Sequence, residues 1–242
     1  MIAGEVSEVS GTINTTTWTT GYVYYVTDDI TVPSGETLTI NAGVRVKFYN
    51  GKGMTVNGNL LANGTAENHI LFTSKEPTPL PGDWSNIDLN GRDNNLTYVD
   101  YKYATDGITG SNVDHTTIDH ITIQGNLSTS ARGIYFQSGD SLTITNNYFS
   151  VQGDYGIYAS NANYSNITNN TIITPSYGIR AHDCDNCSIN ENDINSSDGT
   201  TGPTYGISAD NSSNIDVLNN TMVARAYAIY VPYSFKATIN QN

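Results

Sequence analysis

The sequence predicts an all-β solenoid, a single-stranded parallel β-helix with about 22 residues per coil in its C-terminal half. A motif centred on Gly-Ile recurs at intervals of 23, 22, 28 and 22 residues from Gly133 onward. Within each repeat, apolar residues alternate with polar ones, which is the period of a β-strand. Gly, Asn, Asp and Ser separate the short apolar segments, as tight turns between strands require.

Each repeat keeps its residue types at the same places. Residues 133–136, 156–159, 178–181 and 206–209 begin Gly-Ile, and residues 228–231 read Ala-Ile-Tyr-Val. An apolar residue follows eight positions after each opening, an Asn three positions later, and another apolar residue two further on. Because a solenoid stacks equivalent residues of successive coils, the Ile of each opening should fill one column of the core.

Two polar columns are predicted beside that core. One contains the repeated Asn residues, Asn147, Asn170, Asn192 and Asn220. The other contains the Tyr residues that directly precede each Gly-Ile or Ala-Ile step, Tyr155, Tyr177, Tyr205 and Tyr227. Equivalent residues of successive coils lie about 4.8 Å apart, so the amides should form a hydrogen-bonded ladder and the rings should stack.

The strands ahead of the repeats are irregular. Residues 1–21 are rich in Thr and Ser and are predicted to form an extended lead-in. Alternating apolar residues then indicate strands, which we place near residues 30–32, 38–40, 44–48, 54–56, 70–72, 87–89 and 96–101, before a weaker repeat unit over 107–123. Residues 22–242 are therefore interpreted as a single β-helix domain with clear repeats over 133–242, ending midway through a coil.

The composition narrows the functional classes. Only 14% of the residues are charged, and the net charge of −13 argues against a nucleic-acid partner, because phosphate binding needs clustered Lys and Arg. No apolar run is long enough to predict a membrane span. Scarce charge, 17 Tyr residues and many glycosylation motifs favour an extracellular or cell-surface protein.

The motif Asn-x-Ser/Thr, an acceptor for N-linked glycans, occurs eleven times. The Asn residues are Asn14, Asn63, Asn95, Asn126, Asn163, Asn166, Asn169, Asn186, Asn195, Asn211 and Asn219. We expect these positions to be candidates for glycosylation.

The two cysteines lie close together in the sequence. Cys184 and Cys187 follow His182, and alignment of the repeats places Cys187 in an inward-facing row and Cys184 at a turn. A local disulfide is one interpretation and a single buried thiol is another. A metal site with His182 is a third, although no second cluster completes four ligands.

The row after each repeated Ile has the opposite parity and should face outward. It contains Tyr135, Tyr158, Arg180 and Tyr230, together with Ser208. We predict a ligand-binding row in which Tyr faces stack on the apolar side of pyranose rings. An ordinary solvent-facing strand explains the same residues through β-propensity.

One polar cluster has residue types suited to chemistry. Asp114 and His115 precede Asp119 and His120 by five positions, and on a β-coil these pairs could share a face. They are the candidates for acid–base catalysis or metal binding. Hydrogen bonding at turns explains the same cluster without chemistry.

Residues 28–73 resemble the opening of right-handed β-helix surface proteins with the pectin-lyase-like fold, which are numerous in methanogenic archaea. The resemblance rests on segments such as Asn57-Gly58-Asn59-Leu60-Leu61-Ala62, and on Gly82-Asp83-Trp84-Ser85-Asn86-Ile87, which is similar to a Gly-x-Trp-x-x-Ile step. The Gly-Ile-Tyr and Asn-Asn repeats are similar to those of the same superfamily. The resemblance implies a right-handed coil and leaves function open, because the superfamily holds lyases, hydrolases, adhesins and surface-layer proteins.

Enzymes of that superfamily use recognisable catalytic residues. In this chain such residues are either absent or not distinguished from other residues of the same type. No Gly-His-Gly step is present, and Asp100, Asp106 and Asp114 are acids that could pair for glycoside hydrolysis without any feature selecting them. We favour a protein without enzymatic activity and expect no cofactor. Calcium could bind at Asp-rich turns of an acidic exported protein, although the sequence contains no recognisable calcium-ligand loop.

We therefore predict an extracellular structural or adhesive surface protein, such as a surface-layer, sheath or filament subunit. Its partners would be copies of itself, joined through the ends or faces of the β-helix, because an open coil end presents unpaired strand edges. A fragment of a longer chain explains an open end equally well. The alternative function is a polysaccharide-binding or polysaccharide-cleaving β-helix, a lyase or hydrolase.

Overall fold

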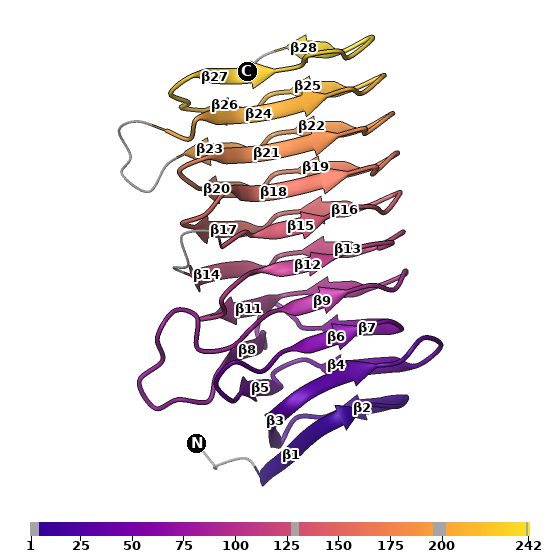
Figure 1. Cartoon of the computed structure of the whole chain (residues 1–242), viewed down its shortest axis with the longest axis vertical. Helices are drawn as coiled ribbons and strands as arrows, with labels where there is room; N and C mark the ends of the chain where they lie inside the picture. Colours follow the sequence, from indigo (N-terminus) through magenta and orange to yellow (C-terminus); the bar gives the residue numbers. More distant parts are fainter. Residues whose placement is uncertain (1–4, 127–130, 196–201, 241) are drawn as a thin grey trace.

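The chain forms a right-handed parallel β-solenoid of about ten coils. The computed structural model describes residues 5–126, 131–195, 202–240 and 242. Each coil contributes one short strand to each of three faces, and the strands of one face stack in parallel along the length of the molecule (Figure 1).

The first face lies toward the left and rear of Figure 1. Its strands are β5 (Arg45–Phe48), β8 (Ile70–Ser74), β11 (Val99–Lys102), β14 (Thr122–Asn126), β17 (Tyr148–Val151), β20 (Thr171–Ile173), β23 (Asp193–Asn195) and β26 (Thr221–Met222).

The second face is turned toward the viewer in Figure 1. Its strands are β6 (Met54–Val56), β9 (Ile87–Leu89), β12 (Ile108–Gly110), β15 (Ile134–Phe136), β18 (Tyr155–Ser160), β21 (Tyr177–His182), β24 (Tyr205–Asp210) and β27 (Tyr227–Tyr230).

The third face is a separate sheet of ten strands. These are β2 (Thr16–Trp18), β4 (Thr37–Asn41), β7 (Asn59–Asn63), β10 (Asn95–Thr97), β13 (Thr117–Asp119), β16 (Thr143–Thr145), β19 (Asn166–Thr168), β22 (Ser188–Asn190), β25 (Asp216–Leu218) and β28 (Thr238–Asn240).

Two long strands join the first and second faces into one sheet of 18 strands. They are β1 (Glu5–Thr12) and β3 (Tyr22–Val32), which pair in parallel with each other. Strand β2 likewise pairs with β4. Residues 5–18 of the expected lead-in thus contribute strands to the first coil, because their polar surface still carries inward residues such as Trp18, which is buried and stacks on Tyr24.

The predicted register of the repeats is confirmed by the pairing of the second-face strands. Ile134 pairs with Ile157, Ile157 with Ile179, and Ile179 with Ile207, and these side chains are fully buried. The glycine before each Ile is required by packing. A Cβ on Gly178 would collide with the Ile194 side chain, so the first face closes against the second only where a side chain is missing.

A ladder of buried amides runs through the corner between the third and first faces. Asn147 donates to Asn170 Oδ1 at 2.9 Å, Asn170 to Asn192 Oδ1 at 2.9 Å, and Asn192 to Asn220 Oδ1 at 2.9 Å. The final step is Asn220 to Asn242 Oδ1, at 3.0 Å. Each Oδ1 also accepts from the backbone N–H of the preceding rung, so the ladder ties adjacent coils together at a place where their backbones turn.

Candidate functional site

The outer surface of the second face carries two adjacent columns of side chains. One column follows the strand pairing from Asp88 through Thr109 and Tyr135 to Tyr158, and continues to Arg180. The other runs along the strand starts, where Tyr155, Tyr177, Tyr205 and Tyr227 pair in register. The N-terminal part of this surface is polar, and the C-terminal part is rich in Tyr.

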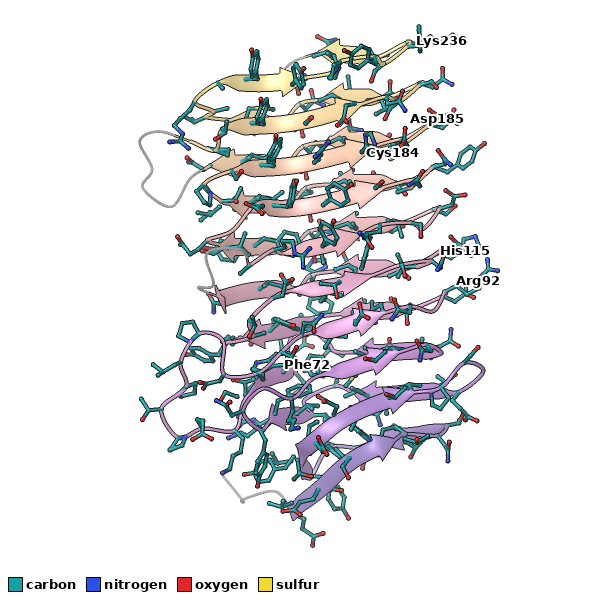
Figure 2. The ribbon with its side chains drawn as sticks, in the orientation of Figure 1. Phe72, Arg92, His115, Cys184, Asp185 and Lys236 are labelled. Atoms are coloured by element: carbon teal, nitrogen blue, oxygen red, sulfur yellow. A yellow bond between two sulfur atoms is a disulfide. The ribbon has the colours of Figure 1, made fainter. Side chains whose placement is uncertain are left out.

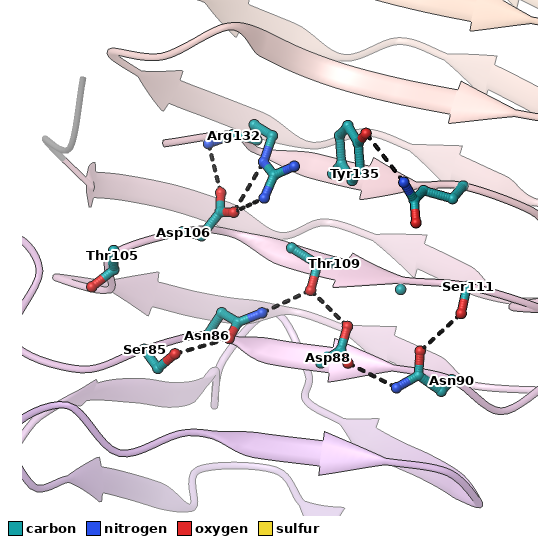
Figure 3. A pocket seen from close by; sticks show the side chains of 12 residues that line it. Ser85, Asn86, Asp88, Asn90, Thr105, Asp106, Thr109, Ser111, Arg132 and Tyr135 are labelled. Carbon is teal, nitrogen blue, oxygen red and sulfur yellow. Dashed lines mark hydrogen bonds and ion pairs between the residues drawn. The ribbon is translucent and has the colours of Figure 1, made fainter. Parts of the chain in front are cut away.

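A groove hollows the polar part of the second face. It has a volume of about 490 Å³ and is lined by residues of β9, β12 and β15 and of the segments directly before and after them (Figure 3). A second cavity of about 450 Å³ shares four of these residues and reaches Asp154 and Tyr155. The groove is lined by Ser85, Asn86, Asp88, Asn90, Thr105, Asp106, Thr109, Gly110, Ser111, Arg132, Tyr135 and Gln137.

An ion pair between Arg132 and Asp106 lies where the two cavities meet. Arg132 Nε donates to Asp106 Oδ2 at 2.9 Å, its Nη2 donates to the same oxygen, and its backbone N–H donates to Oδ1 at 2.8 Å. The guanidinium also lies 4.0 Å from the ring centroid of Tyr135. Burial alone would lower the pKa of Arg132, but the hydrogen bonds and charge of Asp106 outweigh it and raise the pKa. Arg132 therefore stays protonated, its charge is balanced by Asp106, and hydrogen bonds hold its guanidinium in place.

Hydroxyl and amide groups along the groove floor form a hydrogen-bonded chain that converges on the Asp88 carboxylate, drawn as dashed lines in Figure 3. Asn86 donates to Thr109 Oγ1 at 2.7 Å, and Thr109 donates to Asp88 Oδ1 at 2.8 Å. Asn90 donates to Asp88 Oδ2 at 2.7 Å and accepts from Ser111 at 3.1 Å. These bonds fix the rotamers of small polar groups and leave their remaining donors and acceptors facing the groove.

Seven tyrosines continue the surface beyond the groove, and we call them the tyrosine stripe. Its members are Tyr135, Tyr155, Tyr158, Tyr177, Tyr205, Tyr227 and Tyr230. The rings of Tyr177 and Tyr205 stack with centroids 4.6 Å apart and planes 5° apart. Tyr135 and Tyr158 stack at 4.6 Å and 15°.

This stacking changes the expected use of the rings. Between stacked neighbours the ring faces cover each other, so a sugar cannot lie on them as the sequence analysis envisaged for Tyr135 and Tyr158. The stripe instead presents ring edges and phenolic hydroxyls toward solvent. The last two rings are the more open ones: Tyr227 is 50% exposed, Tyr230 is 39% exposed, and their planes are tilted by 42°.

A second charged cluster lies within the stripe. Arg180 donates to both oxygens of Asp210 at 3.3 Å and to Tyr155 Oη at 3.4 Å. His182 Nδ1 lies 2.6 Å from Asp210 Oδ2, and its Nε2 lies 3.1 Å from Asp183 Oδ2. Burial alone would raise the pKa of Asp210, but hydrogen bonds and charge from Arg180, together with His182, lower it.

The structure does not bring the predicted acid–base candidates together. Asp114 and His115 lie before β13, and Asp119 and His120 lie at its other end. His115 Nδ1 is 3.3 Å from Asp93 Oδ1, and Figure 2 shows His115 beside Arg92 on the outer edge of the solenoid.

His120 has a separate set of partners. Its Nδ1 is 2.7 Å from Asp119 Oδ2, and its ring stacks on Tyr98 with centroids 4.5 Å apart. Burial alone would raise the pKa of Asp119, but hydrogen bonds from Asn146 and His120 lower it. Both His residues have positive φ at corners, so each pair is accounted for by turn hydrogen bonding. Within the described ranges, no group of three or more His, Cys, Asp or Glu residues could hold a metal ion.

Cys184 and Cys187 form a disulfide, and both are buried. The bridge spans the corner between β21 and β22, and Figure 2 shows Cys184 further inside the molecule than Asp185. His182 is engaged by the two carboxylates described above and takes no part in the bridge.

The glycosylation motifs avoid the second face. Their exposed Asn residues are Asn14, Asn63, Asn166, Asn169, Asn186, Asn211 and Asn219, and Asn95, Asn163 and Asn195 are partly exposed. The side chain of Asn126, the last residue of β14, lies outside the described set. No strand of the second face contains an Asn-x-Ser/Thr acceptor, among the strands that the structure describes.

Most residues of the groove were not predicted from the sequence. Asp106 was one of three acids that nothing distinguished, and Asp88, Thr109 and Arg132 were not singled out. A signal was present in the repeat: Asp106 and Arg132 both directly precede Gly-Ile steps, the place that Tyr occupies in later coils. Aligning the weaker unit with the clear repeats would have placed both residues at the head of the tyrosine column.

The family of the chain is shown by two matches. Residues 106–242 match the model described as the right handed beta helix region, and residues 11–97 match the pectate-lyase like beta helix domain. Because the first match covers more than half of the chain, the protein belongs to the right-handed β-helix family. No protein among the curated ones matches the sequence. The described residues contain no helix long and apolar enough to cross a membrane.

Solved structures with similar architecture include three proteins of low sequence identity. Tailspike protein 3 of bacteriophage CBA120 is 13% identical with a TM-score of 0.47, covering 96% of this chain and 51% of that one. The periplasmic alginate epimerase AlgG is 12% identical with a TM-score of 0.42, covering 82% and 61%. The A-module of the Azotobacter vinelandii mannuronan C-5 epimerase AlgE4 is 12% identical with a TM-score of 0.42, covering 96% and 72%. The chain thus spans about half the length of the tailspike protein.

Proposed function

We propose that the protein is an extracellular adhesive β-helix that binds a polysaccharide along its second face. The observation that carries this proposal is the groove, most of whose lining residues carry a hydroxyl, amide or carboxylate group. Sugars are recognised through many hydroxyls that both donate and accept hydrogen bonds. A row of fixed Ser, Thr, Asn and Asp side chains supplies both roles at short spacing.

The dimensions of the groove suit such a ligand. Its volume of about 490 Å³ lies within the range of small-molecule sites and is enough for a short stretch of sugar residues. Its floor is built on strands rather than on long loops, and its polar groups are held by hydrogen bonds to one another. That pre-organisation lowers the entropic cost of binding a flexible glycan chain.

The tyrosine stripe extends the same surface along the axis of the solenoid. The hydroxyls of its column Tyr155, Tyr177, Tyr205 and Tyr227 repeat once per coil, at a spacing of about 4.8 Å that is comparable to the length of one pyranose residue in an extended chain. Ring edges and hydroxyls can therefore meet successive sugars of one strand. A polymer that enters the groove would continue over the stripe.

The positions of the glycosylation motifs also favour the second face as the binding surface. Glycans at these motifs, which lie on the first and third faces and at corners, would leave the strands of the second face without an attached glycan. The surface location, the glycans themselves and assembly of copies into a layer, sheath or filament stay predictions. Cleavage of the bound polymer is a separate prediction, which release of new reducing or unsaturated ends would test.

The experiment is affinity electrophoresis of the purified chain in gels that contain defined polysaccharides. For a polymer that retards the wild type, the double substitution Asn86→Ala and Thr109→Val should weaken binding about thirtyfold, since two net hydrogen bonds of about 1 kcal/mol each are removed. Tyr177→Phe with Tyr205→Phe should weaken it less, because the stacked rings remain and only hydroxyls are lost.

Matched controls lie on the first face. Thr122→Val on β14 and Tyr148→Phe on β17 make the same chemical changes away from the groove and should leave retardation unchanged. Thermal unfolding of every variant checks that the coil is intact. Equal retardation of wild type and the groove variant on every polymer, or no retardation at all, would reject the proposed site.

A further inference from the structure

We propose that the glycan taken by the second face is uncharged, bearing hydroxyl or N-acyl groups rather than carboxylates or sulfates. This inference rests on the proposed function and names the class of polymer. It follows from how the charges on this face are arranged, because binding a polyanion requires cations that are free to meet it.

The first cation, Arg132, is already engaged. Three hydrogen bonds join it to Asp106, and the ring of Tyr135 covers one side of its guanidinium. The side chains of Arg132 and Asp106 are 28% and 17% exposed, so the pair is held in a partly desolvated position. A ligand carboxylate would have to compete with Asp106 for the same donors, and it would leave a buried carboxylate without its partner.

The remaining cations near the stripe are engaged as well. Arg180 is bound by Asp210 and Tyr155, as described above. Arg225, at the corner before β27, donates to the Pro175 carbonyl at 3.4 Å and to Thr204 Oγ1 at 3.2 Å. All ten Lys and Arg residues fall among the described residues, and of these Arg132 alone lines the groove or the adjoining cavity.

The groove itself is acidic. Asp88, Asp106 and Asp154 line the two cavities against the single guanidinium of Arg132, and the whole chain carries a net charge of −13. A polyuronate would place a like charge beside these carboxylates at each sugar. An uncharged polymer meets the same carboxylates as hydrogen-bond acceptors for its hydroxyls, at no such cost.

The test compares polymers that share a backbone and differ in charge. Carboxymethyl-cellulose against hydroxyethyl-cellulose, and polygalacturonate against its methyl ester, form two such pairs. For any backbone that binds, the uncharged member should bind about tenfold or more tightly than the charged one at low salt, and the gap should narrow in ~0.5 M NaCl. EDTA in all samples removes divalent ions that could bridge two anions.

A charge-releasing variant sharpens the test. Asp106→Asn with Asp210→Asn keeps an oxygen for the backbone N–H of Arg132 but removes the charge that neutralises each guanidinium. This variant should gain binding to the charged polymers. The control, Asp193→Asn with Asp216→Asn, makes the same change in net charge on the other two faces and should gain none.

The outcomes separate this inference from the proposed function. Tighter binding of the uncharged polymer of a pair supports both the proposed function and the inference of an uncharged ligand. Preference for the charged member, persisting in EDTA, overturns the assignment of an uncharged ligand and leaves glycan binding standing. Failure to bind any polymer of a broad panel that includes both pairs overturns the proposed function and this inference together.

Discussion

The N-terminal and C-terminal coils fill the same cross-section in different ways. In the N-terminal coils, Trp84 stacks on Phe48 with ring centroids 4.1 Å apart and also contacts Tyr101 at 4.7 Å. Phe72 belongs to the same group, in the lower interior of Figure 2. In the C-terminal coils the interior consists of repeated Ile columns and the buried Asn ladder.

The difference lies in how stability is distributed. The aromatic cluster of Phe48, Phe72, Trp84 and Tyr101, which we call the plug, is not repeated along the chain. Trp84 also donates to the Lys102 carbonyl at 2.8 Å, so a single side chain connects neighbouring coils. The ladder divides the same task among equal rungs, each bonded to its two neighbours. In a solenoid, where each coil contacts only the next, a plug concentrates the cost of substitution and a ladder spreads it.

The largest expected effect comes from removing the plug. Trp84 is fully buried, so Trp84→Ala should lower the free energy of unfolding by about 3–5 kcal/mol, through lost burial and the cavity that remains. Chemical denaturation measures the loss, and amide hydrogen exchange locates it. Protection should fall in β5, β8 and β11 and persist in the repeats; a uniform fall along the whole chain would contradict the comparison.

A single rung of the ladder should cost less. Asn192→Ala removes the acceptor of Asn170 and the donor to the Ile167 carbonyl, leaving buried polar groups unpaired at a cost of about 1–3 kcal/mol. Faster exchange should be confined to the coils on either side. Thr143→Ala, on the outer surface of β16, is the control and should change stability by less than about 0.5 kcal/mol. If Asn192→Ala lowered the free energy of unfolding as much as Trp84→Ala, the proposed difference between plug and ladder would be wrong.

The same distinction explains what the sequence could predict. Repetition made the Ile columns and the spacing of Asn147, Asn170 and Asn192 visible, because equivalent residues of stacked coils must meet. The plug is not repeated, so nothing in the sequence near Trp84 predicts that this side chain contacts both Phe48 and Tyr101. Those contacts depend on how irregular coils shift against one another.

The candidate site also has a repeated part, which was predictable from the sequence, and a non-repeated part, which was not. Tyr155, Tyr177 and Tyr205 were visible as a column, yet their spacing did not show that the rings cover each other and leave edges outward. The groove arises where the repeat is weakest, around Asp106 and Arg132. Their pairing needs the structure, because a 26-residue separation carries no signal of contact without an aligned repeat.

The smallest expected effect contrasts the response of the two halves to acid. In the N-terminal coils the pKa of Asp28 is lowered by hydrogen bonding to Lys52, but at a fully exposed position where ion pairs contribute little. In the C-terminal coils the lowered pKa of Asp210 belongs to a carboxylate only 15% exposed, bonded to Arg180 and His182. A carboxyl group whose folded pKa lies below its unfolded value contributes stability above the unfolded pKa, and loses it as the pH falls through the folded one. Below about pH 4, exchange in β21 and β24 should therefore quicken more than in β3. Asp210→Asn should abolish that difference, whereas Asp193→Asn should preserve it, and an unchanged pH profile in Asp210→Asn would assign the acid response to other groups.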